Sequence, residues 1–444
     1  MATLARAADF MWFPWLLGLF LLVGLYYSVR TGFFQLFGIR RWLGGTAGRL
    51  LRAGRRQGTG ITRLQALTTA LASTIGTGSV TGVATAIWFG GPGAVFWMWV
   101  SALLGMMTGC AEKILTLRWR QPGAGGWRGG PMYYIAAGMQ SRFLAVWFSV
   151  ACIGGALAGG GMIQTNAIVQ SIHGAAGASR LWVGVAAAVL AGVILVGGIG
   201  RIARVSELLM PAMALLFLGS AAVVLWLCRD RLPGAFTLIV KSALSPKSAA
   251  GGVGAVAAVR YGVARGVFTN EAGMGSTAIA HANADTKDPG EQGLWGMFEV
   301  FFATLVVCTA TALVILCAGV YDPTAGGAGT DVGVSLAADS FGRVLGQPGA
   351  WVVEASVVLF AFSSVLGWSF YGQTAMEWLF TGRWVKPTWL CAFLLACVWG
   401  SVAPSELVWQ LVDLFSALMA LPNLTALLFL SPQALNLLQK HLNS

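Results

Sequence analysis

Stretches of about twenty apolar residues recur along almost the whole chain, and they constrain its fold more than any other feature. A bilayer core about 30 Å thick is crossed by roughly 20 residues of α-helix. We count eleven such stretches and expect eleven transmembrane helices, at residues 11–29, 63–89, 93–116, 142–171, 181–199, 206–228, 250–281, 293–320, 351–379, 385–402 and 408–430. The chain is therefore predicted to be an all-α, multi-pass membrane protein.

The composition agrees with a chain dissolved in lipid. Hydrophobic residues make up 57% and charged residues 10% of the 444 positions, whereas soluble globular proteins carry about 25% charged residues. The net charge of +12 is the excess of 28 lysines and arginines over 16 acidic residues, and most of the basic residues lie in short segments between the apolar runs, which indicates membrane topology and not nucleic-acid binding. The three histidines, His173, His281 and His441, lie far apart in the sequence, so we expect neither a metal centre nor an enzymatic cofactor.

The positive charges also predict an orientation. When successive loops are assigned to alternate sides of the membrane, nineteen lysines and arginines fall on one side and seven on the other, and the other two, Arg260 and Arg265, lie inside span 250–281. Loops rich in Lys and Arg stay in the cytoplasm, so the richer side is expected to be cytoplasmic. With eleven spans, the N-terminus is then outside and the C-terminus inside.

Two predicted spans carry polar, glycine-rich sequence at their midpoints. Residues 73–79 read STIGTGS in span 63–89, and residues 269–276 read TNEAGMGS in span 250–281. An unsatisfied peptide group costs several kcal/mol in hydrocarbon, so backbone leaves helical geometry there only where it faces protein or a cavity. We therefore predict that both helices are discontinuous and that both breaks face inward.

The spans also divide into two sets. After one leading helix come two groups of five, each opening with a discontinuous helix; because five is odd, the second group is inverted. Inverted repeats with discontinuous helices are typical of secondary transporters that bind substrate at the midplane. The predicted organisation is a leading helix and basic cytoplasmic segment at 1–62, a first repeat at 63–228, an extracellular connector at 229–249, a second repeat at 250–430 and a cytoplasmic tail at 431–444.

A helix broken at the midplane exposes amides on one side of the break and carbonyls on the other. The amides of residues 76–79 would suit a carboxylate, because a helix N-terminus carries positive potential. The carbonyls of Ala72 and Ile75 would suit Na⁺, and those of Phe268 and Thr269 an ammonium group. Together these groups fit a small zwitterion.

Close helix packing is the alternative role for the glycines. Gly78 and Gly82 have the spacing of a GxxxG seam. Packing does not account for the neighbouring hydroxyls or for the matching polar patch in span 250–281. We therefore interpret the two patches as parts of one binding site.

A family resemblance enters at the same residues. The sodium:alanine symporters, or alanine or glycine:cation symporters, have segments similar to LASTIGTGSVTGVATAIWFGGPGAVFWMW (71–99), GGPMYYI (129–135) and GVARGVFTNEAGMGSTAIAHA (262–282). The resemblance runs through nearly the whole chain. It implies a LeuT-like fold of two inverted five-helix repeats with one extra leading helix, in agreement with the span count.

The resemblance also implies roles for single residues. The first broken helix of the family usually reads GTGN; here residues 76–78 match, and Ser79 stands where asparagine is common, which bears on substrate preference or coupling. Gln164 resembles the glutamine that faces the substrate amine, and Asn166 is a second candidate. Phe268 would cap the pocket.

In span 351–379, Ser363 and Ser364 precede Trp368. The resemblance implies that these adjacent hydroxyls complete a sodium site and that Trp368 forms a wall of the pocket. The alternatives are a helix–helix bond for Gln164, backbone-bonded serines and a core tryptophan. The expected substrate site comprises Thr74, Gly76, Thr77, Gly78, Ser79, Gln164, Phe268, Thr269, Asn270, Ser364 and Trp368; the expected sodium ligands are Ala72, Ile75, Ser363 and Ser364.

Ionisable residues inside spans are costly and often functional. We expect Arg265 to meet carbonyls or an acid near the second break, and Glu271 to brace that loop by accepting backbone amides. Four other acids in or beside the spans lie near predicted span ends, where reaching the interface or pairing with loop arginines is expected; they are Glu112, Glu207, Glu354 and Asp413.

These observations favour a secondary active symporter that imports alanine or glycine with Na⁺ by alternating access, in the plasma (inner) membrane of a bacterium. An H⁺-coupled transporter of another small zwitterion is the alternative, and a channel is a further one, although polar residues concentrate at one depth and do not form a continuous stripe. A membrane-embedded enzyme would need a nucleophile and a base at matching depth, and we expect no histidine beside the hydroxyls and Glu271. We expect no cofactor besides the coupling ion, and no nucleic-acid partner.

Overall fold

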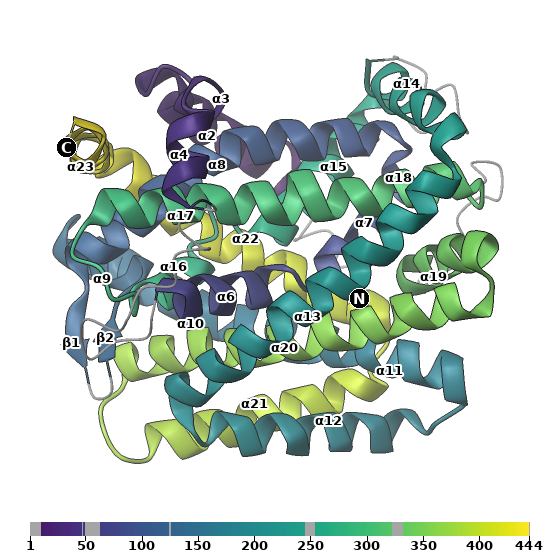
Figure 1. Ribbon diagram of the computed structural model, residues 1–444. Coiled ribbons are helices and arrows are strands. Elements are labelled where there is room, and N and C mark those ends of the chain that lie inside the picture. Colours follow the sequence, from purple (N-terminus) through teal and green to yellow (C-terminus); the bar gives the residue numbers. More distant parts are fainter. Residues whose placement is uncertain are drawn as a thin grey trace.

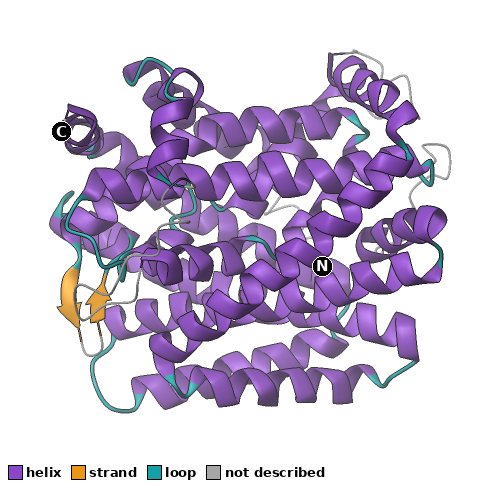
Figure 2. Ribbon diagram, viewed as in Figure 1, coloured by secondary structure: helices purple, strands orange, loops and turns teal. Residues whose placement is uncertain are grey.

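The computed structural model describes residues 10–46, 48, 63–123, 126–244, 254–321 and 332–443. Within these ranges the chain is helical apart from loops and one antiparallel ribbon of β1 (Gln121–Gly123) and β2 (Gly126–Arg128), as Figure 2 shows. Residues 49–62, the second part of the predicted basic segment, lie outside the described residues.

The helices of the first half follow the predicted spans. They are η1 (Trp12–Leu16) with α2 (Leu17–Arg30), α6 (Arg63–Thr74) with η2 (Thr77–Ser79) and α7 (Thr81–Gly90), α8 (Gly93–Trp119), α10 (Arg142–Gly155) with η3 (Ala156–Met162) and α11 (Ile163–Ala176), α12 (Arg180–Leu195) and α13 (Gly198–Leu227).

The helices of the second half also follow the predicted spans. Its helices are α15 (Ala255–Asn270) with α16 (Ser276–His281), α17 (Pro289–Val300) with η5 (Phe301–Cys308) and α18 (Thr309–Ala318), α20 (Gln347–Leu379), α21 (Val385–Val402) and α22 (Ser405–Phe429). Shorter helices lie between or after these: α3 (Phe34–Phe37), α4 (Ile39–Gly45), α9 (Pro131–Ala137), η4 (Arg229–Arg231), α14 (Leu232–Leu244), α19 (Val332–Leu345) and α23 (Ser431–Asn443).

Seven helices in the described part of the chain are long and apolar enough to cross a membrane. They are α8, the continuous helix Arg142–Gly174, α13, the continuous helix Pro289–Ala318, α20, α21 and α22. Three shorter apolar helices, Pro14–Arg30, Thr81–Gly90 and Arg180–Leu195, also coincide with predicted spans. The all-helical, multi-pass architecture is thus confirmed, and the total of eleven spans stays a prediction.

Helix ends follow the local sequence. Asp288 caps α17, because its Oδ1 accepts the backbone amide of Gly290 at 2.9 Å, and Pro289 fills the first helical position. Gly177 ends α11 in the left-handed conformation, with φ of 64°. These signals set where the spans begin and end.

Two long helices bracket the discontinuous ones. Helix α8 packs against α2, α7, α15 and α17, and α20 packs against α6, α10, α11, α13 and α19. Helices α12 and α21 lie side by side along one edge of the molecule (Figure 1). The outer face of α13 is apolar and open, with Leu208 and Leu215 each 75% exposed, as a lipid-facing surface requires.

The long helices run roughly parallel, so the bundle has two ends (Figure 1). The β1–β2 ribbon and α23 lie at one end, and α14 and α19 at the other. Helix α14 occupies the predicted connector and packs on α8, while α23 occupies the predicted tail and packs on α17 and α8. The discontinuous helices lie between these ends, inside the bundle.

Candidate functional site

The first discontinuous helix breaks where the sequence predicts. Helix α6 ends at Thr74, Gly76 adopts an extended conformation with ψ of −153°, and α7 begins at Thr81. The break is closed by short turns: the Gly76 amide donates to the Thr74 carbonyl at 2.9 Å, and the Ser79 amide donates to the Gly76 carbonyl at 3.2 Å. Residues 67–86 are all buried, so the irregular backbone faces protein, as hydrocarbon demands.

The second discontinuous helix breaks between Asn270 and Ser276. Three residues there have positive φ: Glu271 at 55°, Gly273 at 92° and Gly275 at 79°. Two of the three are glycine, which adopts this conformation without steric cost. Glu271 adds one more helical hydrogen bond after the end of α15, because its amide donates to the Val267 carbonyl at 2.8 Å.

The side chain of Glu271 has different partners from those expected. It accepts hydrogen bonds from the hydroxyl of Ser276 and, at 3.1 Å, from the indole Nε1 of Trp368. The expectation that it accepts backbone amides is therefore wrong. Glu271 instead connects the second break to α20, because Trp368 lies on that helix.

The two breaks come into direct contact. A Cβ added at Gly78 would lie 2.9 Å from Thr269 Oγ1 and 3.2 Å from Phe268 Cδ1. A Cβ at Gly76 would collide with the Ser364 hydroxyl and lie 3.4 Å from Gln164 Oε1. Glycine is thus required at both positions by close approach, and six of the predicted site residues meet at this junction: Gly76, Gly78, Gln164, Phe268, Thr269 and Ser364.

Gln164 joins the first break to the helix formed by α10, η3 and α11. Its Oε1 accepts the Thr77 amide at 3.4 Å, and its Nε2 donates to the Gly159 carbonyl at 3.0 Å within the π-helical segment η3. The Thr77 hydroxyl is buried and has no hydrogen-bond partner among the described residues. A buried polar atom without a partner is rare, and here it lies in the predicted binding segment.

Three of the four predicted sodium ligands also converge. The Ser363 hydroxyl lies 2.7 Å from the Ala72 carbonyl and 2.8 Å from the Phe360 carbonyl of its own helix, and the Ser364 hydroxyl lies 3.3 Å from the Ala72 carbonyl and 2.9 Å from that of Ser73. Ile75, the fourth, follows in the last turn of α6, where its amide donates to Leu71 at 2.7 Å. Neutral hydroxyl and carbonyl oxygens at a half-helix C-terminus fit a Na⁺ ion.

The two aromatic residues of the predicted pocket are packed on different neighbours. Phe268 is buried, and its ring contacts the ring of Trp409 edge to face at 5.4 Å. Trp368 packs edge to face on Tyr371 at 5.6 Å and lies directly on Gly160, where an added Cβ would collide with it. Glycine at residue 160 therefore lets Trp368 approach the first repeat.

Three other predicted residues point elsewhere. Asn270 caps the second break, since its Oδ1 accepts the Ala272 amide at 3.0 Å and its Nδ2 donates to Thr304 at 3.2 Å. Asn166 donates to the carbonyl of Gly400 at 3.0 Å, which is a contact between helices. Thr74 contacts Glu299 on α17 at 2.8 Å. The last predicted site residue is Ser79, whose backbone carbonyl accepts a hydrogen bond from the Thr311 hydroxyl at 2.9 Å.

Arg265 meets an acid near the second break, as expected. Its Nη1 lies 3.1 Å from Asp413 Oδ1, and its guanidinium group is 4.3 Å from the centroid of Trp409. Asp413 thus pairs inside the bundle and not with a loop arginine. The pair lies directly beside Phe268, because Phe268 and Arg265 contact the same tryptophan.

The expectation for Glu112 is wrong. It is fully buried on α8 and does not reach the membrane interface. Its Oε1 accepts the Gly273 amide at 2.9 Å and the Asn423 side chain at 2.7 Å. Glu112 therefore braces the second break in the way that was expected of Glu271.

A cluster of buried charges was not expected from the sequence. Lys113 Nζ lies 3.2 Å from Glu299 Oε2, and His281 Nε2 lies 3.3 Å from the same oxygen. His281 is thus close to the polar residues of both breaks, although those of the first break are distant from it in the sequence. The sequence offers little signal for it, because these residues lie near the ends of the predicted spans 93–116, 250–281 and 293–320, where ionisable side chains are expected to reach the interface.

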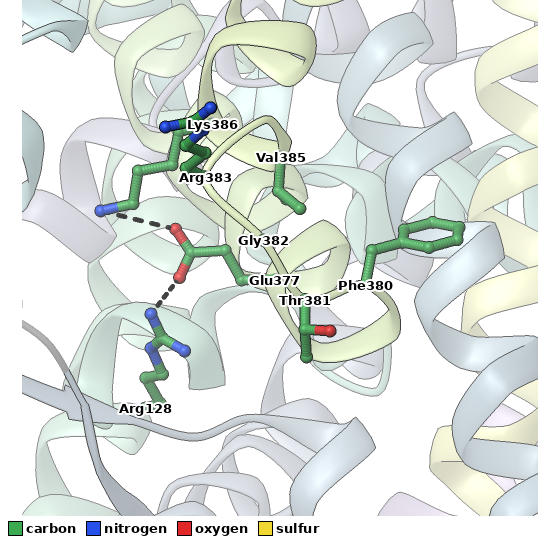
Figure 3. Close-up of a pocket in the computed structure, with 8 residues that line it drawn as sticks. All are labelled: Arg128, Glu377, Phe380, Thr381, Gly382, Arg383, Val385 and Lys386. Atoms are coloured by element: carbon green, nitrogen blue, oxygen red, sulfur yellow. Dashed lines mark ion pairs between the residues drawn. The ribbon is translucent and has the colours of Figure 1, made fainter.

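A separate pocket opens on the surface where α20 ends and α21 begins (Figure 3). Its volume is about 290 Å³, and Glu377 forms ion pairs there with Arg128 at 2.5 Å and Lys386 at 3.7 Å. Its lining residues are Arg128, Glu377, Phe380, Thr381, Gly382, Arg383, Val385 and Lys386. None of these belongs to a discontinuous helix, so the pocket is separate from the junction of the breaks.

Comparison with known proteins identifies the family of this chain. The model of the sodium:alanine symporter family matches residues 1–444. The chain belongs to the sodium:alanine symporter family. It is therefore a multi-pass membrane transporter and not an enzyme, and the coupling ion of its family is Na⁺.

Individual relatives agree with this assignment. The chain is 38% identical to the sodium/alanine symporter AgcS of Methanococcus maripaludis over 95% of its length and 93% of that protein. It is 36% identical to the probable sodium/glutamine symporter GlnT of Bacillus subtilis over 96% of this chain and 87% of that protein. Among solved structures, MhsT in complex with L-phenylalanine matches with a TM-score of 0.59 and 15% identity, over 87% of this chain and 99% of that one. The chain therefore has the LeuT fold of that neighbour.

Proposed function

We propose that this protein imports alanine or glycine together with Na⁺ by alternating access. The observation that carries the proposal is the junction of the two breaks, where Gly76 lies against Ser364 and Gln164 and Gly78 lies against Phe268 and Thr269. Peptide groups, an amide side chain and hydroxyls from both broken helices are held within contact distance there. Family membership supplies the class of solute and ion.

The proposed architecture has eleven spans, with helices two to six and seven to eleven as inverted repeats after one leading helix. The LeuT-fold neighbour supports the general arrangement. The N-terminus is outside and the C-terminus in the cytoplasm, because most of the lysines and arginines then face the cytoplasm. In this orientation, Arg265 and Asp413 lie on the outer side of the junction and Glu112 on the inner side.

The proposed substrate site uses the groups already at the junction. The substrate carboxylate binds near the Thr77 amide, whose present bond to Gln164 is long at 3.4 Å, and near the unpartnered Thr77 hydroxyl. The ammonium group binds the carbonyls of Phe268 and Thr269, with Gln164 Oε1 as a further acceptor. A charged ligand is a stronger partner for these groups than the neutral contacts that they now make.

The proposed sodium site lies between α6 and α20. Na⁺ would bind the Ala72 and Ile75 carbonyls and the hydroxyls of Ser363 and Ser364. Both hydroxyls already contact the Ala72 carbonyl. Ser364 contacts both sites, since it also lies against Gly76. Occupancy of one site therefore changes the position of a ligand of the other, which is the physical basis of coupling.

The aromatic walls limit the substrate to a small side chain. Phe268 and Trp368 are both buried against neighbouring aromatic rings, so neither moves without disrupting packing. Each surplus methylene would have to fit between them and the two glycines. A relative named as a probable glutamine symporter makes glutamine the most informative competitor.

Uptake into proteoliposomes tests the proposal. We expect alanine uptake that requires an inward Na⁺ gradient and increases with inside-negative potential, since one charge moved through 100 mV supplies about 2.3 kcal/mol. Uptake driven by a proton gradient alone would replace Na⁺ by H⁺ as the coupling ion. Flux that follows the alanine gradient without either ion would indicate a channel and overturn the proposal. Thermal stabilisation by glycine, alanine or glutamine, with and without Na⁺, identifies the preferred substrate.

A further inference from the structure

Four ionisable side chains form a closed group inside the bundle, which we call the buried charge cluster: Glu112, Lys113, His281 and Glu299. All four are completely buried. They come from three helices, α8, α16 and α17, and the proposed transport site uses none of them. Intramembrane ionisable groups are rare and costly, so a cluster of four calls for a role.

The cluster connects both discontinuous helices. The Thr74 hydroxyl, at the end of α6, lies 2.8 Å from Glu299 Oε1. Lys113 Nζ donates to Thr277 on α16 at 2.7 Å, and His281 is itself on α16. Glu112 holds the Gly273 amide at 2.9 Å. A change of charge in the cluster therefore acts on both broken helices at once.

The charges of the cluster do not balance when its histidine is neutral. Two carboxylates face one ammonium group, with Lys113 at 3.4 Å from Glu112 and 3.2 Å from Glu299. The other titratable groups near it are Glu271 at the second break, Cys110 of α8, Tyr27 of α2, Tyr134 of α9 and Tyr371 of α20. None of these groups adds a positive charge, so one negative charge stays buried, which is strongly unfavourable.

The hydroxyl of Thr74 indicates where a proton belongs. Its Oγ1 lies 2.8 Å from two acceptors, the Ala70 carbonyl and Glu299 Oε1. A hydroxyl has one hydrogen to donate, so it cannot satisfy both. A proton on Glu299 Oε1 completes the chain: Glu299 donates to Thr74, and Thr74 donates to Ala70.

His281 offers a second position for the same proton. Its Nδ1 contacts the side-chain amide of Gln292, while its Nε2 faces Glu299 Oε2 at 3.3 Å. The Gln292 oxygen has no partner among the described residues in the present orientation. A rotation of the amide exchanges its nitrogen and oxygen, and Oε1 then accepts a hydrogen from a doubly protonated His281. Neither position requires any other side chain to move.

We propose that Glu299 and His281 share one bound proton, which makes the buried charge cluster a proton-binding site distinct from the proposed sodium site. Binding of the proton neutralises the cluster, and a proton on Glu299 also closes the hydrogen-bond chain from α17 through Thr74 to α6. Its loss leaves a net negative charge and two acceptors for one hydrogen, which weakens the contact between α6 and α17. The proton thus controls how firmly the two broken helices are held, a property beyond the transport of substrate and Na⁺.

Spectroscopy on the purified full-length protein tests proton binding without transport. We expect either a protonated carboxyl C=O band in the infrared spectrum at neutral pH that disappears in E299Q, or a doubly protonated imidazole signal in ¹⁵N-histidine NMR that disappears in H281Q. The variants E207Q and H173Q, which alter a carboxylate and a histidine outside the cluster, should keep these signals. An ionised Glu299 together with a neutral His281 at neutral pH would overturn the proposal.

A transport measurement then tests the consequence. Because E299Q carries an amide in place of the carboxyl group, it resembles the protonated state permanently. We expect Na⁺-driven uptake by the unaltered protein and by E207Q to depend on pH, and uptake by E299Q to lose that dependence. The same pH profile in all three proteins would contradict the inferred control. If no protein takes up alanine, the proposed function fails while the spectroscopic result stands on its own.

Discussion

Gly78 of the first discontinuous helix lies directly against Thr269 of the second, so that an added Cβ would be 2.9 Å from the threonine hydroxyl. The two residues are separated by most of the first repeat, and each lies where its helix departs from regular geometry. Their contact means that neither broken helix can shift without displacing the other. This mechanical coupling is what alternating access between two repeats requires.

Replacing Gly78 tests this contact. In G78A the new methyl group meets Thr269 at 2.9 Å and the Phe268 ring at 3.2 Å, so we expect the breaks to separate and alanine uptake to fall at least tenfold, which corresponds to about 1.4 kcal/mol. The matched control is G82A on the next turn, where the nearest atom is Thr269 Oγ1 at 3.8 Å. G82A should retain uptake, and both proteins should elute as folded material in size-exclusion chromatography. Equal uptake by G78A and the unaltered protein would refute the role of the contact.

The adjacent serines of α20 predict an effect on the Na⁺ dependence of uptake. Removing either hydroxyl in S363A or S364A deletes one proposed ligand, so we expect the Na⁺ concentration for half-maximal uptake to rise about tenfold, equivalent to roughly 1.4 kcal/mol. S356A is the control, because Ser356 is a buried serine of the same helix that bonds its own backbone, at 2.7 Å from the Val352 carbonyl. A loss of stability without a change in sodium dependence would assign Ser363 and Ser364 a purely structural role.

Glu112 predicts an effect on stability. Its carboxylate accepts the Gly273 amide at 2.9 Å and the Asn423 amide at 2.7 Å, and it lies 3.4 Å from Lys113. E112A leaves these donors buried without an acceptor, and breaking a buried charged pair typically costs about 3–5 kcal/mol. We expect a clear drop in the melting temperature of the detergent-purified protein. E112Q keeps an oxygen acceptor, so its melting temperature should fall less. E406A, which alters an exposed glutamate, should leave the melting temperature unchanged.

The breaks themselves were predictable, because a polar, glycine-rich segment in the middle of an apolar run is incompatible with a regular helix that faces lipid. The convergence of Gly76, Ser364 and Gln164 followed from the family resemblance and is visible in the structure. The buried charge cluster was not predictable, since Thr74 and Glu299 are 225 residues apart and no periodicity joins them. The same holds for Glu112: distance from a span end says nothing of whether a long-range partner such as Asn423 lies inside the bundle.

Phe268 predicts a change in substrate size. Its ring lies against Gly78 and packs edge to face on Trp409, so F268L removes part of the pocket wall while keeping an apolar side chain. We expect glutamine to stabilise F268L in the presence of Na⁺, whereas only glycine and alanine stabilise the unaltered protein, because one or two methylenes of added room are worth about 1–3 kcal/mol of discrimination. F217L removes a ring that packs on Phe341 and Phe360 away from the junction. It should lower the melting temperature and leave the substrate order unchanged. If F217L broadens the substrate range as F268L does, general loosening of the bundle, and not the wall at Phe268, sets selectivity.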